Sequence, residues 1–397
     1  MQSRLTQFGA GVGAAFLVFT AFAVLLHSTD EAPPSPTRAQ IRNPKGAVDR
    51  LTFIDTTDQF AQGKLQRAKV SSDGGAGIVL NDDRARGWPL EGTWTSPQMA
   101  AEFPFTNLIP SWNVLTPTET GVQFEARARD AMTGEWSPWL YMGAWGREAY
   151  EIERRIEAGP AKIDIDEMIL SRPADAYQVR AKLFNFDFDR SVTPRIRRIA
   201  VSYSGTPGDR KLDQRPTDGW ARDLKVPFRA QGDPIVPPGL RGKICSPTSV
   251  SMVLHHWGVD RPTVNNALAI YDSNYEMFGN WNRAVQYAGQ CGMDAWLTRF
   301  RNWEQVKGEI ARGQPVIASI RFQRGTFPSN VNPQSDGHLI VIRGMTPQGD
   351  AIVNDPASIE RGNGVIYKAD ELAQAWFDNG GVGYIIRPPA NAATAAR

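Results

Sequence analysis

Only a few residues of this chain can supply nucleophilic or acid–base chemistry near neutral pH, because its 397 residues include two cysteines and four histidines. This scarcity excludes cysteine-rich zinc modules, iron–sulfur clusters and a scaffold held by many disulfides. Cys245 directly precedes a predicted helix, so unpaired N–H groups and the positive end of the helix dipole face its sulfur. That setting favours the thiolate, which is the form that attacks a carbonyl carbon. Cys245 is therefore the candidate nucleophile.

A nucleophilic cysteine needs a general base, and the four histidines differ in their suitability. His255 and His256 occupy the last turn of the same predicted helix, roughly 15 Å from Cys245 at ~1.5 Å per residue. We expect them to interact with the final carbonyls of that helix. His27 borders an amino-terminal apolar segment. His338 remains as the candidate base.

A predicted β-hairpin brings a carboxylate to His338. His338 opens the segment GHLIVIRGM and Asp355 closes DAIVNDP. If the hairpin centres between Thr346 and Pro347, positions that sum to 693 lie opposite each other, as 338 and 355 do. A slip of two in that sum leaves the pair as diagonal neighbours, still within side-chain reach. A carboxylate there fixes the imidazole tautomer and favours the imidazolium, whereas Asn354 would face away and is the weaker third member.

Structural alternatives stand beside this Cys–His–Asp prediction. Cys245 and Cys291 could form a disulfide, which an exported chain permits. Against it, Cys291 continues an apolar helical face with Ala284 and Ala288 and so already has a packing role. His338 could equally be a buried histidine with a purely structural hydrogen bond.

The elements that would position these residues form two regions. From about 47 to 205, segments such as GVQFEARARD alternate apolar and polar residues, which predicts antiparallel strands of a β-sandwich. Beyond about 224, apolar residues recur with helical spacing in three segments: PTSVSMVLHHWG, NWNRAVQYAGQCG and NWEQVKGEIARG. Predicted strands follow in PVIASIRF, GHLIVIRGM and DAIVNDP, and then a helix around ADELAQAWF and a last strand in VGYIIR. Helices followed by an antiparallel sheet predict an α+β domain.

The predicted sandwich contains two features that could bind ligands. It contains six tryptophans: Trp88, Trp94, Trp112, Trp136, Trp139 and Trp145. Exposed tryptophans could bind sugar rings, whereas buried ones would fill the ends of the sandwich core, and the core is the favoured interpretation. Asn185, Asp187 and Asp189 share one strand face and could ligate a hard cation, although a solvated face explains them better.

The amino terminus predicts export. Residues 8–26 form an almost purely apolar stretch that follows Arg4, as in a cleaved signal peptide or a signal anchor. With 44 basic and 42 acidic residues, the balanced charge gives no indication of nucleic-acid binding. The predicted organisation is a signal peptide or anchor (1–30), a Pro-rich tether (31–46), the all-β sandwich (47–205), a linker (206–223), the α+β domain (224–390) and a disordered tail (391–397).

Four segments of the second region resemble papain-like cysteine peptidases related to the double-glycine leader (bacteriocin-processing) peptidases: KICSPTSVSMVLHHWG, GQPVIASI, GHLIVIRGM and DAIVNDPAS. They occur in order between about Leu224 and Pro388, which is under half of the chain. The resemblance implies a papain-like fold, with Cys245 as nucleophile, His338 as general base and acid, and Asp355 as the residue that orients the imidazole. The sandwich more loosely resembles galactose-binding-like jelly-roll modules of exported hydrolases through SWNVLTP and GEWSPW.

The resemblance also implies an oxyanion-hole glutamine upstream of the cysteine. Gln231 is the best candidate, with the backbone N–H of Cys245 as second donor. Its separation of 14 residues from Cys245 is longer than in many members, and Ser246 stands where many members have glycine. Leader-processing members are fused to a transporter and an ATPase, but GLRGK lacks the spacing of a phosphate-binding loop. A role in bacteriocin export is therefore not expected.

Together these features predict an exported cysteine peptidase or amidohydrolase that uses Cys245, His338, Asp355 and Gln231 and needs no metal or organic cofactor. The expected substrate is a peptide or a peptidoglycan-like amide of the cell envelope, with a glycan as a further ligand of the sandwich. Two alternatives remain. One is a non-catalytic envelope protein that binds glycan or peptide on a peptidase-like scaffold, and the other is an acyl transferase that uses the same thioester.

Overall fold

The computed structural model describes residues 49–81, 90–147, 154–187, 192–205 and 219–389, all of which belong to one compact unit, Thr37–Arg397. The predicted signal or anchor segment, the tether, the tail and most of the linker lie outside the described residues. The last two linker positions, Arg222–Asp223, form the short strand β13. Among the described residues, no helix is both long enough and apolar enough to cross a membrane.

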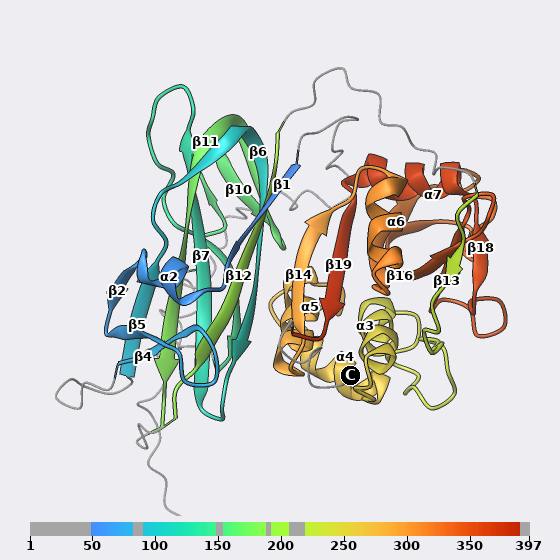
Figure 1. Ribbon diagram of the computed structural model, residues 1–397, viewed down its shortest axis with the longest axis horizontal. Coiled ribbons are helices and arrows are strands. Elements are labelled where there is room, and N and C mark those ends of the chain that lie inside the picture. Colours follow the sequence, from blue (N-terminus) through green and yellow to red (C-terminus); the bar gives the residue numbers. More distant parts are fainter. Residues whose placement is uncertain (1–48, 82–89, 148–153, 188–191, 206–218, 390–397) are drawn as a thin grey trace, which may run out of the picture. The chain divides into compact units, whose positions relative to one another are not determined.

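The first region is built from antiparallel strands that belong to one twelve-stranded sheet network (Figure 1). One short helix, α2 (Thr57–Ala61), follows the first strand. The strands are β1 (Asp49–Ile54), β2 (Lys64–Gln66), β3 (Ala68–Ser71), β4 (Gly77–Leu80), β5 (Leu90–Thr95), β6 (Met99–Leu115), β7 (Thr120–Asp130), β8 (Leu140–Gly146), β9 (Glu157–Ala158), β10 (Ala161–Asp164), β11 (Glu167–Asn185) and β12 (Arg195–Ser204).

Two long strands let this network fold into a sandwich. β11 pairs with β6 through Met168–Tyr177 and with β5 through Arg180–Asn185. β6 in turn leaves β11 and pairs its second half with β12. Register shifts interrupt the β11–β6 pairing between Ile169 and Ala176, and such bulges bend a strand. The structure thus agrees with the predicted all-β region.

The alternation predicted for GVQFEARARD is present in β7, but its polar face is not solvated. Val122 and Phe124 are buried on one side, whereas Gln123 and Glu125 on the other side are also almost fully covered. Glu125 accepts hydrogen bonds from Arg180 and Lys182 of the neighbouring strand. Buried carboxylates require such partners, so this outer face is a packed polar layer.

The tryptophans of the sandwich lie in the core or under arginine side chains. Trp94, Trp112 and Trp145 are buried, as the core interpretation predicted. The guanidinium of Arg127 lies 4.7 Å from the ring centroid of Trp136 and 4.6 Å from that of Trp139. Trp88 and Asp189 lie outside the described residues. In the candidate cation site, Asn185 Oδ1 accepts from the backbone N–H of Asp187.

The second region combines a seven-stranded antiparallel sheet with five α-helices and one 3₁₀ turn. Its strand order is β14-β19-β15-β16-β17-β18, and β13 also pairs with β16. The helices α3, α5, α6 and α7 each pack against strands of this sheet. The elements are α3 (Cys245–His256), α4 (Thr263–Ile270), α5 (Trp281–Gln290), β14 (Asp294–Arg299), α6 (Trp303–Ala311), β15 (Val316–Phe322), β16 (Ser335–Met345), β17 (Ala351–Asn354), β18 (Val365–Tyr367), α7 (Ala369–Trp376), η2 (Phe377–Asn379) and β19 (Val382–Arg387).

The predicted helices form because caps and stops flank them. Asn280 and Asn302 accept hydrogen bonds from first-turn N–H groups and start α5 and α6. Gly258, Gly292 and Gly313 follow α3, α5 and α6 with positive φ angles, the conformation in which glycine commonly ends a helix. α4, β14 and β18 were not predicted from the sequence.

The predicted register of the β16–β17 hairpin is wrong by two positions. Val341 pairs with Asn354, so opposite positions sum to 695 near the site instead of 693. The turn is longer than predicted, because Thr346 N–H bonds the carbonyl of Asp350 and Gly349 adopts a φ of 84°. A left-handed residue of this kind favours a three-residue hairpin loop. His338 and Asp355 are therefore diagonal neighbours.

Candidate active site

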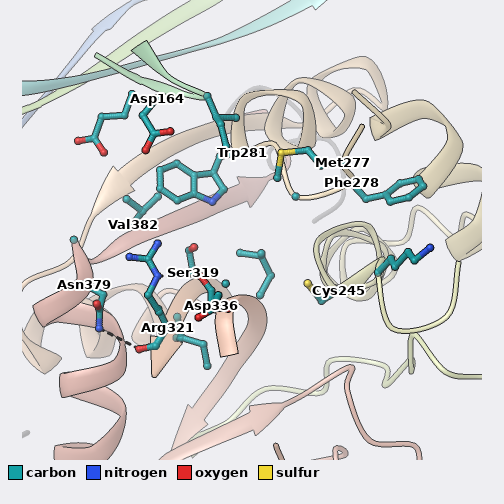
Figure 2. A pocket seen from close by; sticks show the side chains of 18 of the residues that line it. Asp164, Cys245, Met277, Phe278, Trp281, Ser319, Arg321, Asp336, Asn379 and Val382 are labelled. Carbon is teal, nitrogen blue, oxygen red and sulfur yellow. Dashed lines mark hydrogen bonds between the residues drawn. The ribbon is translucent and has the colours of Figure 1, made fainter. Parts of the chain in front are cut away.

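Cys245 lies at the amino-terminal end of α3, where it is the first helical residue. Its side chain is half-buried and faces a cavity (Figure 2). The sulfur accepts hydrogen bonds from the backbone N–H groups of Ser246 and Leu339. The remaining residues of the first turn, Pro247 and Thr248 among them, are fully or almost fully buried, which fixes the helix end beneath the thiol.

His338 and Asp355 contact each other across the ends of β16 and β17. The distance between His338 Nε2 and Asp355 Oδ1 is 2.7 Å, and both side chains are buried. The other face of the imidazole reaches the Cys245 thiol, which hydrogen-bonds His338. Since Nε2 is engaged by the carboxylate, Nδ1 is the nitrogen left for the sulfur. The three residues thus form one continuous hydrogen-bonded chain.

The charges of Cys245, His338 and Asp355 shift the pKa of each of these groups in the direction that favours its charged form. Burial alone would raise the pKa of Cys245, but the hydrogen bond and charge of His338 bring it below its ordinary value. Burial alone would lower the pKa of His338, yet the Asp355 carboxylate and the Cys245 sulfur raise it to about 10. Burial would raise the pKa of Asp355, and the imidazolium overcomes this and lowers it. All three shifts favour the charged forms, which are thiolate, imidazolium and carboxylate.

Tyr367 is a member of the site that sequence reasoning missed. Its hydroxyl donates to Asp355 Oδ2 at 2.6 Å, and the backbone N–H of Ala357 donates to Oδ1 at 2.9 Å. The Tyr367 hydroxyl also accepts from the N–H of Val331. Burial and the adjacent carboxylate raise the pKa of Tyr367, so it remains a hydrogen-bond donor. Its position in the short strand β18 left no periodic signal that could have identified it.

We expect Tyr367→Phe to slow hydrolysis indirectly, because Asp355 would then position His338 less well. The substitution removes one of the hydrogen bonds to a fully buried carboxylate, which destabilises the ionised form and weakens its hold on His338. The expected result is about a tenfold lower rate of peptide hydrolysis, with the alkaline limb of the pH–rate profile moved to lower pH. Steady-state kinetics between pH 5 and 11 measures both. A slower enzyme with an unchanged pH profile would mean that Tyr367 is only structural.

Gln231 lies beside the carboxyl-terminal end of β17. Its backbone N–H donates to the carbonyl of Pro356, the residue after Asp355, at 2.8 Å. The side chain is almost fully buried, and its Oε1 has no hydrogen-bond partner among the described residues. The structure thus places the Gln231 backbone beside Asp355, but Gln231 is not among the residues that line the cavity at Cys245.

The remaining thiol and histidines have other partners. Both cysteines are free thiols, so the alternative of a Cys245–Cys291 disulfide is not realised. Burial raises the pKa of Cys291, which hydrogen-bonds Tyr287 at the end of α5. His256 contacts the carbonyls of Lys225 and Gly313 in other segments, rather than the last carbonyls of its own helix as expected. His255 contacts Arg229.

A cavity of about 520 Å³ opens at Cys245. Figure 2 shows Cys245 on one side of it, with Asp164, Trp281 and Val382 on the other side. The cavity is bounded by segments far apart in the sequence, from Asp164 of β10 to Gly380 after η2. Ser319, Arg321 and Asp336 line its floor beside the residues that precede His338. The site therefore combines an activated thiol with room for an extended ligand.

Two family models match the chain. Residues 50–204 match the Peptidase C39 N-terminal domain, and residues 223–384 match the Peptidase_C39 like family. The cysteine-peptidase-like second region that the sequence motifs indicated is confirmed by the second of these models. The comparison with curated proteins gives no match.

Several solved structures are similar to parts of the chain. A double-glycine motif protease from an AMS/PCAT transporter, solved with its leader peptide, is 20% identical over 42% of this chain and 94% of its own, with a TM-score of 0.28. A C39-like peptidase from Bacillus anthracis is 16% identical over 42% of this chain and 98% of its own, with a TM-score of 0.32. A carbohydrate-binding module of a laminarinase from Zobellia galactanivorans is 13% identical over 38% of this chain and 98% of its own, with a TM-score of 0.20.

Proposed function

We propose that the chain is an exported cysteine peptidase or amidohydrolase of papain-like α+β architecture, with Cys245, His338 and Asp355 as its catalytic residues. The observation that carries the proposal is the 2.7 Å hydrogen bond between His338 and Asp355, together with the interaction of that imidazole with Cys245, which lies at the wall of a cavity. A half-buried cysteine of lowered pKa at a helix start is the setting in which a thiol becomes a nucleophile.

In the proposed reaction the Cys245 thiolate attacks the carbonyl carbon of an amide. The amide nitrogen of Gln231 and the backbone N–H of Cys245 would donate to the oxyanion. The C–N bond breaks as the imidazolium of His338 gives its proton to the leaving amine, and a thioester with Cys245 remains. His338 then takes a proton from water, the resulting hydroxide attacks the thioester, and the acid and free thiol are released. Asp355 keeps the imidazole oriented throughout.

The proposed substrate is a peptide or a peptidoglycan-like amide outside the cytoplasm. Support for export comes from the apolar segment 8–26 that follows Arg4, with membrane attachment if this segment is retained. The transferase alternative uses the same thioester with an amine in place of water, so product analysis separates the two. A glycan ligand for the sandwich is less well supported, because Trp139 packs under the guanidinium groups of Arg127 and Arg180.

The test of the proposed nucleophile compares the two thiols within one protein. Iodoacetamide at pH 6.5 is expected to modify Cys245 at least about 30-fold faster than Cys291, because the pKa of Cys245 is lowered and that of Cys291 is raised. Peptide mapping by mass spectrometry at successive times measures both rates. Cys245→Ala should fold, lose the fast phase of iodoacetamide labelling and hydrolyse no peptide. Cys291→Ala should keep both the fast labelling phase and the hydrolysis of peptide. Equal slow modification of the two thiols would contradict the proposal.

A further inference from the structure

The turn between β10 and β11 belongs to the sandwich, but its carboxylates are bonded to the second region. Asp166 accepts from the backbone N–H groups of Trp281 and Asn282 at 2.7 and 3.1 Å and so caps the start of α5. The adjacent Glu167 forms a buried ion pair with Arg299 of β14 and also accepts from Asn107. Charge-assisted hydrogen bonds in a buried setting hold this turn firmly in place.

Ile165 occupies the tip of this turn in a conformation that a β-branched residue rarely adopts. Asp164 pairs with Glu167, so Ile165 and Asp166 form a two-residue hairpin loop. The φ of Ile165 is 58°, in the left-handed region where glycine is normally found. Such strain persists only where the surrounding structure enforces it.

The strain coincides with the cavity at Cys245. The half-buried side chain of Ile165 lines that cavity together with Asp164 and Glu167. Glu276, with a φ of 49°, lines it as well, so two of the four non-glycine residues with positive φ among the described residues meet at this site. The remaining two, Arg67 and Glu119, lie elsewhere in the sandwich. Strained residues that gather at a cavity indicate that their side chains are required there.

The cavity that Ile165 lines has apolar walls beside charged ones. Met277, Phe278, Trp281 and Val382 contribute apolar side chains to it, next to charged residues such as Glu276 and Arg321. Figure 2 shows Trp281 and Val382 between Asp164 and the Arg321 floor. Because these residues come from the second region and Ile165 comes from the sandwich, neither region alone encloses the space.

We propose that Ile165 is a specificity-determining residue of the Cys245 cleft, supplied by the sandwich, and that the cleft selects a peptide with an apolar side chain at the position that packs against it. This deepens the proposed function and rests on it, since the ligand is the peptide that Cys245 would attack. The sandwich thereby acts as part of the substrate-binding surface, held against α5 and β14 by Asp166 and Glu167.

Equilibrium binding to the full chain carrying Cys245→Ala tests this without depending on turnover. The probes are N-acetylated tetra-alanine amides in which each alanine in turn is replaced by leucine or aspartate, and calorimetry gives each Kd. At one position leucine should bind at least about fivefold more tightly than aspartate, as expected for ~40 Å² of apolar surface removed from water. Adding Ile165→Gly should abolish this preference, and it should leave the fold intact because glycine accepts the positive φ.

Arg67→Gly in the same Cys245→Ala background is the matched control, because Arg67 is an exposed sandwich residue with a φ of 48° away from the cavity. It should keep the full leucine preference. A preference that survives Ile165→Gly, or that no position shows, would overturn the inference. If the preference behaves as expected but wild-type protein hydrolyses no peptide, the cleft assignment stands and the proposed catalytic function falls. If Ile165→Gly hydrolyses peptides with unaltered selectivity, the proposed catalytic function stands and the assignment of Ile165 to the cleft falls.

Discussion

Replacing His338 with alanine is expected to lower the rate of peptide hydrolysis at pH 7 by at least about 10³-fold. The imidazole hydrogen-bonds the Cys245 sulfur and, with its charge, holds the thiol pKa below its ordinary value. Without it, burial dominates, so the thiol pKa rises and the leaving amine has no proton donor. Initial rates on a peptide substrate and iodoacetamide kinetics at Cys245 measure the two consequences separately.

The matched control is His255→Ala, which removes a histidine of the same domain that contacts Arg229 and lies at the far end of α3. Its activity should stay within about twofold of wild type. A His338→Ala protein that is folded and still hydrolyses at the wild-type rate would eliminate the proposed mechanism. Loss of hydrolysis in both variants would point instead to a structural effect on α3.

Replacing Asp355 with asparagine is expected to slow hydrolysis by about 10²-fold at pH 8 and to narrow the pH–rate profile. In the wild type the thiolate–imidazolium pair exists between the lowered pKa of Cys245 and the raised pKa of His338, about 10. Activity should therefore rise with pH through the first value and fall through the second. The neutral amide removes the charge that raises the pKa of His338, so the alkaline limb moves to lower pH. The weaker imidazolium charge also moves the acidic limb to higher pH.

Asp350→Asn provides the comparison for this substitution. Asp350 is a carboxylate at the other end of the same hairpin, where it pairs with Lys368. Its removal should leave both limbs of the profile in place. Measurement of kcat/KM from pH 5 to 11 for the three proteins decides the matter: an alkaline limb near pH 10 in Asp355→Asn would show that the carboxylate does not set the pKa of His338.

The composition and local patterns of the chain were sufficient to identify the candidate chemistry. With two cysteines and four histidines, elimination left Cys245 and His338 as one plausible pair, and the structure joins them by a hydrogen bond. The helix that begins at Cys245 and the strands that carry His338 and Asp355 follow from periodicity and from glycine stops. These features are local, so a sequence alone can specify them.

Contacts between distant segments were decided only by the tertiary structure. The hairpin register shifted by two positions because the turn took a three-residue form, although the side chains of His338 and Asp355 still meet. Tyr367 reaches Asp355 from a three-residue strand, and Ile165 reaches the Cys245 cavity from the sandwich. Neither contact has a periodic signature in the sequence.

What the sequence by itself determined was thus the candidate nucleophile, its candidate base and the elements that carry them, because scarcity and periodicity are properties of the chain. What only the tertiary structure decided was which groups surround that pair: a buried tyrosine behind the carboxylate and a strained isoleucine in the wall of the cleft. The reason is physical. Burial, pKa and cavity shape arise from packing between segments that are distant along the chain, and the local sequence does not show which of these segments will contact each other.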